Sequence, residues 1–146
     1  DLGLAAALDW QVKRFGEMMD LESVFVSGPE DSHLEKDLTI ALFRIAQEAL
    51  TNVARHAEAS RVEVRLIEER YSVLLEVQDD GRGIEEAEIS SWGALGILGM
   101  RERAHLFGGE IEIKGSRGVG TRVVVRIPLD SDVQLHGGED RGEGGG

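Results

Sequence analysis

The sequence predicts an α/β fold, specifically a two-layer sandwich in which a mixed, mostly antiparallel sheet is covered on one face by about three helices. Alternating apolar residues indicate two hairpins, and three segments with apolar residues at helical spacing indicate the helices. The predicted order is helix, strand, helix, two strands, helix, two strands. Because strands mostly follow strands, a doubly wound parallel sheet is disfavoured.

The first half of the chain is predicted to form a helix, a short strand and a long helix. Apolar residues repeat at helical spacing over Leu2–Gly16, whereas Leu21–Ser27 alternates weakly and stops at a Gly-Pro pair. Leu34–Ala57 carries core positions throughout and is predicted to be one long helix. Ser32, with Glu35 three residues later, is a candidate N-cap for it.

The second half is predicted to form two hairpins around a helix. Arg61–Glu69 and Ser72–Gln78 alternate in hydrophobicity and are separated by a short polar turn. Gly96–Phe107 has the spacing of a helix and ends at a Gly-Gly pair. Glu110–Lys114 and Gly120–Pro128 make the second hairpin.

Composition excludes several classes of protein. The chain has 146 residues, no Cys and a net charge of −12. A disulfide scaffold, a thiolate zinc site and a thiol nucleophile are therefore excluded, and a general nucleic-acid binder is disfavoured. No apolar run has the length of a membrane span, although a membrane anchor in a longer parent protein remains open. We expect one domain over residues 1–129 and a disordered, acidic, Gly-rich tail over residues 130–146.

A first polar cluster lies on the predicted long helix. Glu48, Asn52 and His56 are spaced four residues apart and would share one helix face. That face is either simply solvated or it borders a cleft. In a cleft, the Asn52 carbonyl could ligate Mg²⁺ and Glu48 could hold a metal-bound water or act as a base. Arg55 and His56 could meet phosphate charge.

A second cluster follows an apolar strand directly. Asp79 and Asp80 precede Gly81, Arg82 and Gly83, which is also the composition of an ordinary tight turn. The functional alternative uses the ionised Asp79 as a pure acceptor, which would select the amino group of adenine over the carbonyl of guanine. Gly81 and Gly83 would let the backbone approach the base. The loop from residue 80 to residue 92 is then expected to act as a lid.

Two further clusters are rich in glycine. Gly93, Gly96 and Gly99 lie at the start of a predicted helix, where backbone N–H groups could hold an anion. A flexible loop with a helix cap is the alternative. Gly115–Thr121 joins the last two strands and is either a plain turn or a site where the Thr121 hydroxyl donates to a phosphate or ribose oxygen.

The order and spacing of these clusters resemble the ATP-binding catalytic domain of bacterial sensor histidine kinases, within the gyrase, Hsp90, histidine kinase and MutL ATPase superfamily. Phe43–His56 resembles the N box and Asp79–Gly83 the G1 box. Gly96–Gly99 with the following Met100–Ala104 resembles the G2 box, and Gly118–Thr121 the G3 element. The likeness runs from about Asp1 to Leu129 and is greatest to the subfamily of nitrate sensors and the lipid-fluidity sensor.

The resemblance implies a Bergerat ATP-binding fold (GHKL type) that binds Mg-ATP and donates the γ-phosphate to a histidine on a dimerisation domain upstream. It implies a cytoplasmic domain of a homodimeric parent, monomeric in isolation, whose partner is a response regulator with a helix-turn-helix output domain. It implies no direct nucleic-acid contact. The implied site comprises Glu48 and Asn52 as catalytic residues, Asn52 as the metal ligand, and Arg55, His56, Asp79, Gly81, Gly83, Gly96, Gly99, Met100 and Thr121 as further nucleotide contacts.

Some residues depart from the family pattern. Asp80 stands where the family often has Asn and is expected to add negative charge near the site, and Ala94 replaces one glycine of a pair. None of the four histidines opens a helical hairpin followed by an acid, so the phosphoacceptor is expected upstream of Asp1. The histidines are His33, His56, His105 and His136.

Two alternatives to this function are considered. An anti-sigma-type protein serine kinase shares the fold, but the run from Met100 to Arg103 and the N-terminal segment argue against it. A non-catalytic interaction module is disfavoured by the presence of Asn52, Asp79 and Gly99.

Overall fold

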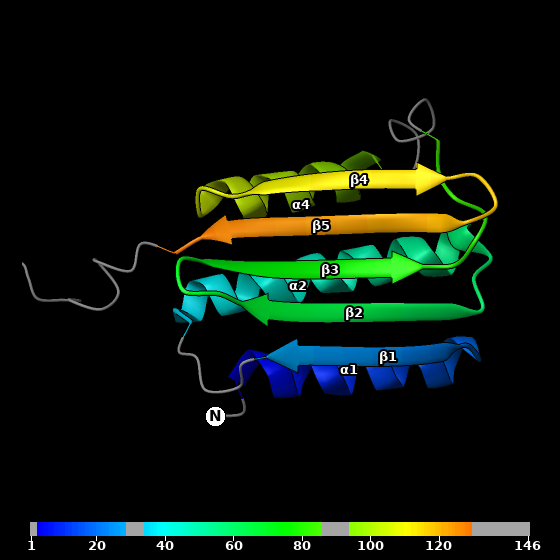
Figure 1. Cartoon of the computed structure of the whole chain (residues 1–146), viewed down its shortest axis with the longest axis horizontal. Helices are drawn as coiled ribbons and strands as arrows, with labels where there is room; N and C mark the ends of the chain where they lie inside the picture. The colour runs from blue at the N-terminus through cyan, green and yellow to red at the C-terminus, as the bar shows by residue number, and fades with distance from the viewer. Residues whose placement is uncertain (1–2, 29–33, 86–93, 130–146) are drawn as a thin grey trace, which may run out of the picture.

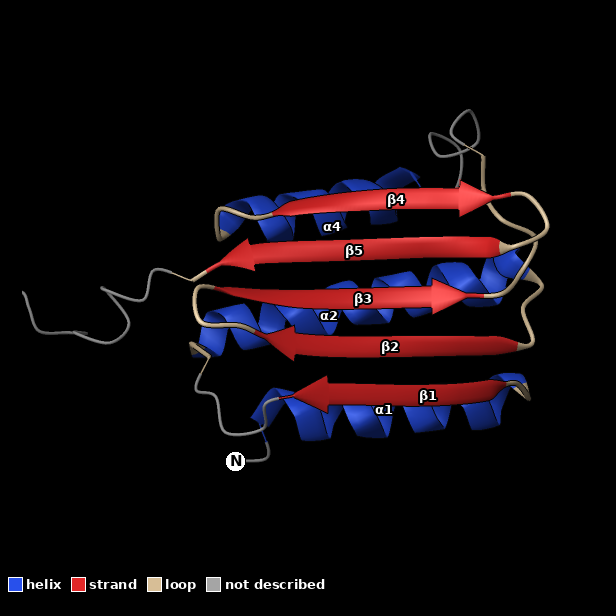
Figure 2. Cartoon of the chain, viewed as in Figure 1, coloured by secondary structure: helices blue, strands red, loops and turns tan. Residues whose placement is uncertain are grey.

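The computed structural model describes residues 3–28, 34–85 and 94–129. They form a five-stranded sheet with helices on one face, which confirms the predicted α/β class (Figure 2). None of the helices in these ranges combines the length and apolar character needed to cross a membrane. The elements are α1 (Gly3–Met19), β1 (Glu22–Gly28), α2 (Lys36–Asn52), η1 (Val53–Ala57), β2 (Arg61–Glu68), β3 (Ser72–Asp79), α4 (Ala94–Leu106), β4 (Glu110–Ser116) and β5 (Gly120–Pro128).

The helices lie side by side behind the sheet (Figure 1). Helix α1 packs on β1, α2 on β3, and α4 on β4 and β5. One residue in two along each central strand faces this layer, and the apolar helix stripes complete a single core. Burying these side chains is the main stabilising contribution to the fold. Fully buried members include Leu8, Leu42, Val64, Leu75 and Met100.

The strand order is β1-β2-β3-β5-β4, with β1 parallel to β2 and the other pairs antiparallel. Both predicted hairpins are confirmed, and β5 lies between β3 and β4. The register places Gln78 opposite Arg122. The next residue pair, Asp79 and Thr121, therefore meets where β3 ends and β5 begins.

The long helix differs from the prediction at both ends. Helix α2 begins at Lys36 after Glu35, which makes no side-chain cap, so the prediction of Ser32 as N-cap is wrong. The prediction of one α-helix to residue 57 is also wrong, because α2 gives way to the π-helix η1 after Asn52. The wider π turn means that residues after Asn52 do not continue the i, i+4 face.

Candidate functional site

Asp79 is the buried carboxylate at the end of β3. Its side chain follows Leu75 and Val77 on the helix-bearing face of the sheet, and the residue is 2% exposed. Among the described residues, its Oδ1 accepts hydrogen bonds from the N–H groups of Gly81 at 2.8 Å and Thr121 at 3.3 Å. Burial raises the pKa of Asp79, and the neighbouring Asp80 charge adds to this, while the two N–H donors oppose it.

The turn between β4 and β5 packs against the glycine-rich loop that follows Asp79. Gly83 has a positive φ of 81°, and a Cβ there would overlap the Ser116 carbonyl. A Cβ at Gly120 would likewise overlap the carbonyl of Asp79. The Ile84 N–H donates to Oγ1 of Thr121 at 3.0 Å.

These contacts give the cluster at Gly115–Thr121 a supporting role beside the loop that follows Asp79. Close backbone approach, rather than chain flexibility, explains why glycine occupies these positions. The Gly118 N–H donates to the Arg82 carbonyl at 2.9 Å and adds to the same contact. Thr121 contributes both its N–H and its hydroxyl oxygen to the loop around Asp79.

Asn52 lies in the last turn of α2 and is completely buried. Neither its Oδ1 nor its Nδ2 has a hydrogen-bond partner among the described residues. A buried amide without partners costs about 1–3 kcal/mol. The C-terminal end of α2 lies at the same edge of the molecule as the end of β3 (Figure 1). A ligand at this edge would satisfy the amide.

The first turns of α4 pack against α2 near this edge. Gly96 lies so close to the Glu48 carboxylate that a Cβ at Gly96 would overlap it. A Cβ at Gly99 would come within 3.0 Å of the Arg103 guanidinium. The Met100 side chain, also on α4, is fully buried. Helix α4 begins at Ala94, two residues before its predicted start, so Gly96 lies within the first turn.

The remaining predicted site residues differ in their environment, and some lie outside the described part of the chain. Arg55 is exposed on η1, and the side chain of His56 lies outside the described part of the chain. Gly81 is buried beside Asp79, to which its N–H donates. Most of the predicted lid, residues 86–93, lies outside the described residues, as does the predicted disordered tail, residues 130–146.

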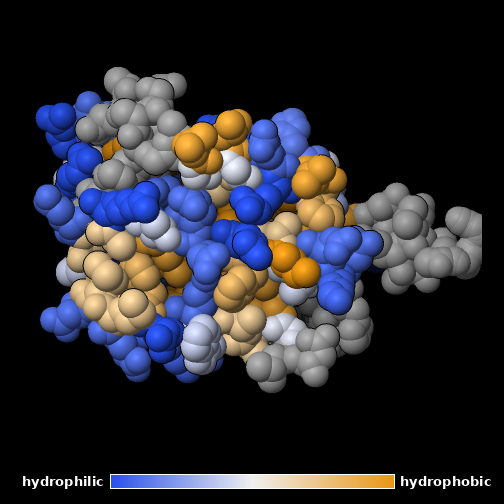
Figure 3. Space-filling model, turned by 180° about the vertical axis from the view of Figure 1, so that it is seen from behind, coloured by the Kyte–Doolittle hydropathy of each residue, from blue (hydrophilic) through white to orange (hydrophobic). Residues whose placement is uncertain are grey.

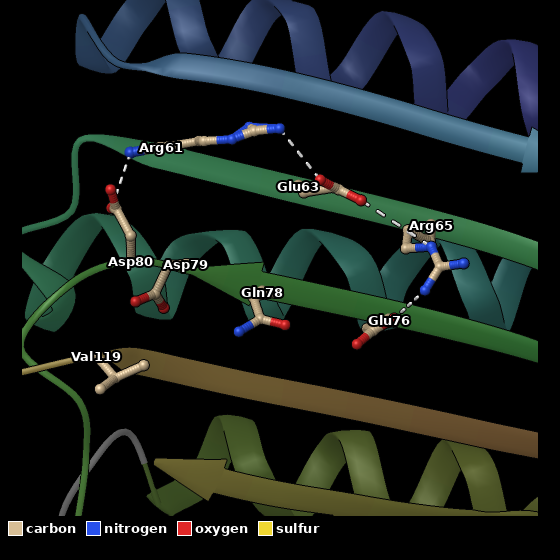
Figure 4. Close-up of a pocket in the computed structure, with 8 residues that line it drawn as sticks. All are labelled: Arg61, Glu63, Arg65, Glu76, Gln78, Asp79, Asp80 and Val119. Carbon is tan, nitrogen blue, oxygen red and sulfur yellow. Dashed lines mark hydrogen bonds and ion pairs between the residues drawn. The ribbon is translucent and has the colours of Figure 1, made fainter. Parts of the chain in front are cut away.

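Asp80 adds negative charge beside Asp79, as the sequence predicts, and this charge contributes to the raised pKa of the Asp79 carboxyl. The Asp80 carboxylate turns toward the start of β2 (Figure 4), where Oδ1 accepts from the N–H groups of Ser60 and Arg61 at 2.8 and 2.9 Å. Oδ2 accepts from the Ser60 hydroxyl at 2.7 Å. The Ser60 hydroxyl first, and then the Arg61 N–H, lower the pKa of Asp80. Asp80 is therefore satisfied by β2 rather than by a ligand.

The helix-free face of the sheet carries a charged groove that the sequence analysis did not predict (Figure 4). Its Arg65 pairs with the buried Glu76 at 3.1 Å, and Arg122 pairs with the same carboxylate. The alternation of strand residues could have revealed these charges as one outward row. Lining the groove are Arg61, Glu63, Arg65, Glu76, Gln78, Asp79, Asp80 and Val119.

The helix-bearing face exposes several apolar side chains (Figure 3). Leu95 is 86% and Leu98 50% exposed on the first half of α4, close to Gly96. Contiguous exposed apolar residues beside a candidate site are typical of a surface that meets another protein or segment.

Comparison with known proteins gives a consistent result. The sequence profile of the family described as "Histidine kinase-, DNA gyrase B-, and HSP90-like ATPase" matches residues 37–131. The chain is 33% identical over 132 residues to the signal transduction histidine-protein kinase/phosphatase DegS of Brevibacillus brevis, covering 90% of this chain and 34% of that protein. It is 31% identical over 134 residues to DegS of Bacillus subtilis (strain 168), covering 88% of this chain and 35% of that protein. The chain thus spans about a third of the length of these relatives.

Solved structures share the fold. The histidine kinase domain of the blue-light activated histidine kinase from Erythrobacter litoralis EL346 superposes with a TM-score of 0.72 at 26% identity, over 91% of this chain and 68% of that one. The ATP binding domain of PrrB from Mycobacterium tuberculosis gives a TM-score of 0.71 at 24% identity, over 88% of this chain and 96% of that one.

Proposed function

The chain belongs to the histidine kinase-, DNA gyrase B- and HSP90-like ATPase family, and we propose that it is the ATP-binding catalytic domain of a two-component sensor histidine kinase. In this role it binds Mg-ATP and presents the γ-phosphate to a histidine on a dimerisation and phosphoacceptor domain outside this chain. The observation that carries the proposal is the buried Asp79 carboxylate, held at the end of β3 by backbone donors.

Adenine selection follows from the acceptor chemistry of Asp79. The two backbone donors both use Oδ1, which leaves Oδ2 to accept from the amino group of adenine. Guanine presents a carbonyl at the same ring position, and two acceptors facing each other are unfavourable. Gly81, whose N–H donates to this carboxylate, is assigned to close approach of the base, and Gly83 lets the loop pack against the Ser116 carbonyl. Thr121 and the β4–β5 turn fix the loop.

The phosphates and the metal ion are assigned to the helix side of the site. The orphaned, buried Asn52 amide fits a Mg²⁺ ligand, because Mg²⁺ takes one or two protein oxygens and otherwise phosphates and water. Bound there, Mg²⁺ would neutralise phosphate charge. Gly96, in the first turn of α4, offers its backbone N–H to the phosphates. Gly99, one turn later, is assigned to close approach of the phosphates because it has no side chain. Glu48, which lies against Gly96, is assigned to hold a metal-bound water or to act as a base.

The remaining assigned contacts are Arg55, His56 and Met100. The exposed Arg55, with His56 beside it, is assigned to phosphate charge, and the buried Met100 to the floor beneath the nucleotide. Catalysis is then mainly positioning and charge stabilisation, since phosphoryl transfer needs little covalent participation by the protein. A nitrogen of the acceptor histidine forms a bond to the γ-phosphorus. The bond between the γ-phosphorus and the bridging oxygen breaks, and ADP leaves with that oxygen.

The partners follow from the same assignment. The exposed leucines of α4 suit a helical hairpin that carries the acceptor histidine. The parent protein is proposed to be a homodimer that passes the phosphoryl group to a response regulator with a helix-turn-helix output domain. We place this domain in the cytoplasm and in the subfamily of nitrate sensors and the lipid-fluidity sensor.

The test is phosphoryl transfer in trans. The chain is mixed with a separate dimerisation hairpin from the parent kinase and with ATP labelled on the γ-phosphate. We expect Mg-dependent labelling that is lost in acid, because phosphohistidine is acid-labile whereas phosphoserine survives. Acid-stable label on a protein substrate would instead support the serine kinase, and an absence of Mg-ATP binding would support an interaction module.

A further inference from the structure

Asp80 links the end of β3 to the start of β2, and the proposed function depends on the relative position of these two parts of the chain. Its carboxylate accepts three hydrogen bonds, two from Ser60 and one from the Arg61 N–H, at 2.7 to 2.9 Å. The connection is reciprocal, since the Asp80 N–H donates to the Arg61 carbonyl at 3.2 Å. The Glu22 N–H also donates to the Ser60 carbonyl at 2.9 Å, which fixes this corner to β1.

The contact between Asp80 and Ser60 joins the segment that follows Asn52 to the segment that follows Asp79. Ser60 follows the π-helix η1, which itself follows Asn52 directly. Asp80 follows Asp79, at the end of β3. Between η1 and β2, Glu58 holds a left-handed conformation with φ 53°, which a non-glycine residue adopts at a cost. The donors on Ser60 and Arg61 hold the chain immediately after this unfavourable turn.

We propose that Asp80 is a positioning residue that fixes the end of α2, and with it the Asn52 amide, relative to Asp79. In this role it contacts neither nucleotide nor metal. Its carboxylate points toward Arg61 (Figure 4). This inference rests on the proposed function, because it assigns Asp80 to the coupling between the adenine half and the metal half of one site. When the contacts of Asp80 are lost, we expect a decrease in the gain in ATP affinity that Mg²⁺ provides.

Substitutions of Asp80 can distinguish a positioning role from an effect of its negative charge. In Asp80→Asn, the side-chain oxygen can still accept from both backbone N–H groups, and the amide nitrogen can donate to the Ser60 hydroxyl oxygen. All three contacts survive without the negative charge. In Asp80→Ala, all three are lost and the Ser60 and Arg61 donors turn to water. Ser60→Ala removes the hydroxyl contact alone and serves as the graded control.

The experiment measures ATP affinity by calorimetry with and without Mg²⁺ for the four proteins, with thermal unfolding as a check on folding. For Asp80→Ala we expect the Mg-dependent gain in affinity to fall about tenfold, as when a residue that orients a metal ligand is lost. Affinity without Mg²⁺ should change about twofold or less, since a lost surface contact has little effect. Asp80→Asn should match the wild type, and Ser60→Ala should fall between them.

The outcomes distinguish this inference from the function beneath it. An unchanged Mg-dependent gain in folded Asp80→Ala, or an equal loss in Asp80→Asn, would overturn the positioning role while ATP binding stands. Should Asp80→Ala not fold, Ser60→Ala decides, and its failure to reduce the gain overturns the inference. If the wild type does not bind ATP, the proposed function fails and takes this role with it.

Discussion

Replacing Asp79 by Asn should separate ligand recognition from stability, because the two change in opposite directions. The side chains have nearly the same shape, and the amide oxygen can keep both backbone hydrogen bonds of Oδ1. The amide nitrogen then replaces Oδ2 and directs a donor at the amino group of adenine.

The expected loss of affinity can be worked from this geometry. A hydrogen bond to a charged group contributes about 1.5–3 kcal/mol, and a buried group left unmatched costs about 1–3 kcal/mol. Taking the lower part of this range, about 3 kcal/mol, gives roughly a hundredfold weaker ATP binding. Stability should stay the same or rise, because Asp79 is 2% exposed and burial raises its pKa. Ionised Asp79 is therefore a cost to the folded state at neutral pH.

The assay is calorimetric titration of both proteins with ATP and GTP, combined with thermal unfolding. The wild type should strongly prefer ATP, and Asp79→Asn should lose most of this preference because its amide can donate to the guanine carbonyl. Equal affinity of the wild type for ATP and GTP would refute the adenine assignment. So would an Asp79→Asn protein that binds ATP like the wild type.

The other predictions concern pH, the orphaned amide and two close backbone contacts. Since the pKa of folded Asp79 is raised above 3.8, the unfolding free energy should fall as pH rises from 3.8 through the folded pKa, and urea titrations of Asp79→Asn should lack this decrease. Asn52→Leu should abolish the effect of Mg²⁺ on ATP affinity, yet raise the unfolding free energy by about 1 kcal/mol in urea titrations, because an unsatisfied amide is removed. Gly96→Ala should displace the flexible Glu48 carboxylate but leave Tm nearly unchanged, because Ala also favours the helix. Gly120→Ala should lower Tm clearly, because a Cβ would overlap the Asp79 backbone carbonyl at a φ of 138°.

Periodicity predicted most of the elements because each has one apolar face. The alternation of Val62 and Val64 on β2, and of Leu75 and Val77 on β3, marks the face that packs on the helices. Strand order was not predictable in the same way. The parallel pairing of β1 with β2, and the place of β5 between β3 and β4, depend on contacts between segments distant in sequence.

The candidate site shows a similar division. The position of Asp79 after an apolar strand was readable from the sequence, and the structure buries it as expected. The π turn after Asn52 was not, because helical spacing alone does not report a one-residue widening of the backbone. Likewise, adjacent Asp79 and Asp80 look equivalent in sequence. They differ because strand alternation sends their side chains to opposite sides of the sheet.

A crystal structure of the chain with Mg²⁺ and a non-hydrolysable ATP analogue would test the central assignment most directly. We predict that the adenine amino group lies within hydrogen-bonding distance of Asp79 and that the cation is ligated by Asn52. An adenine ring out of hydrogen-bonding reach of Asp79, or a cation remote from Asn52, would contradict the account.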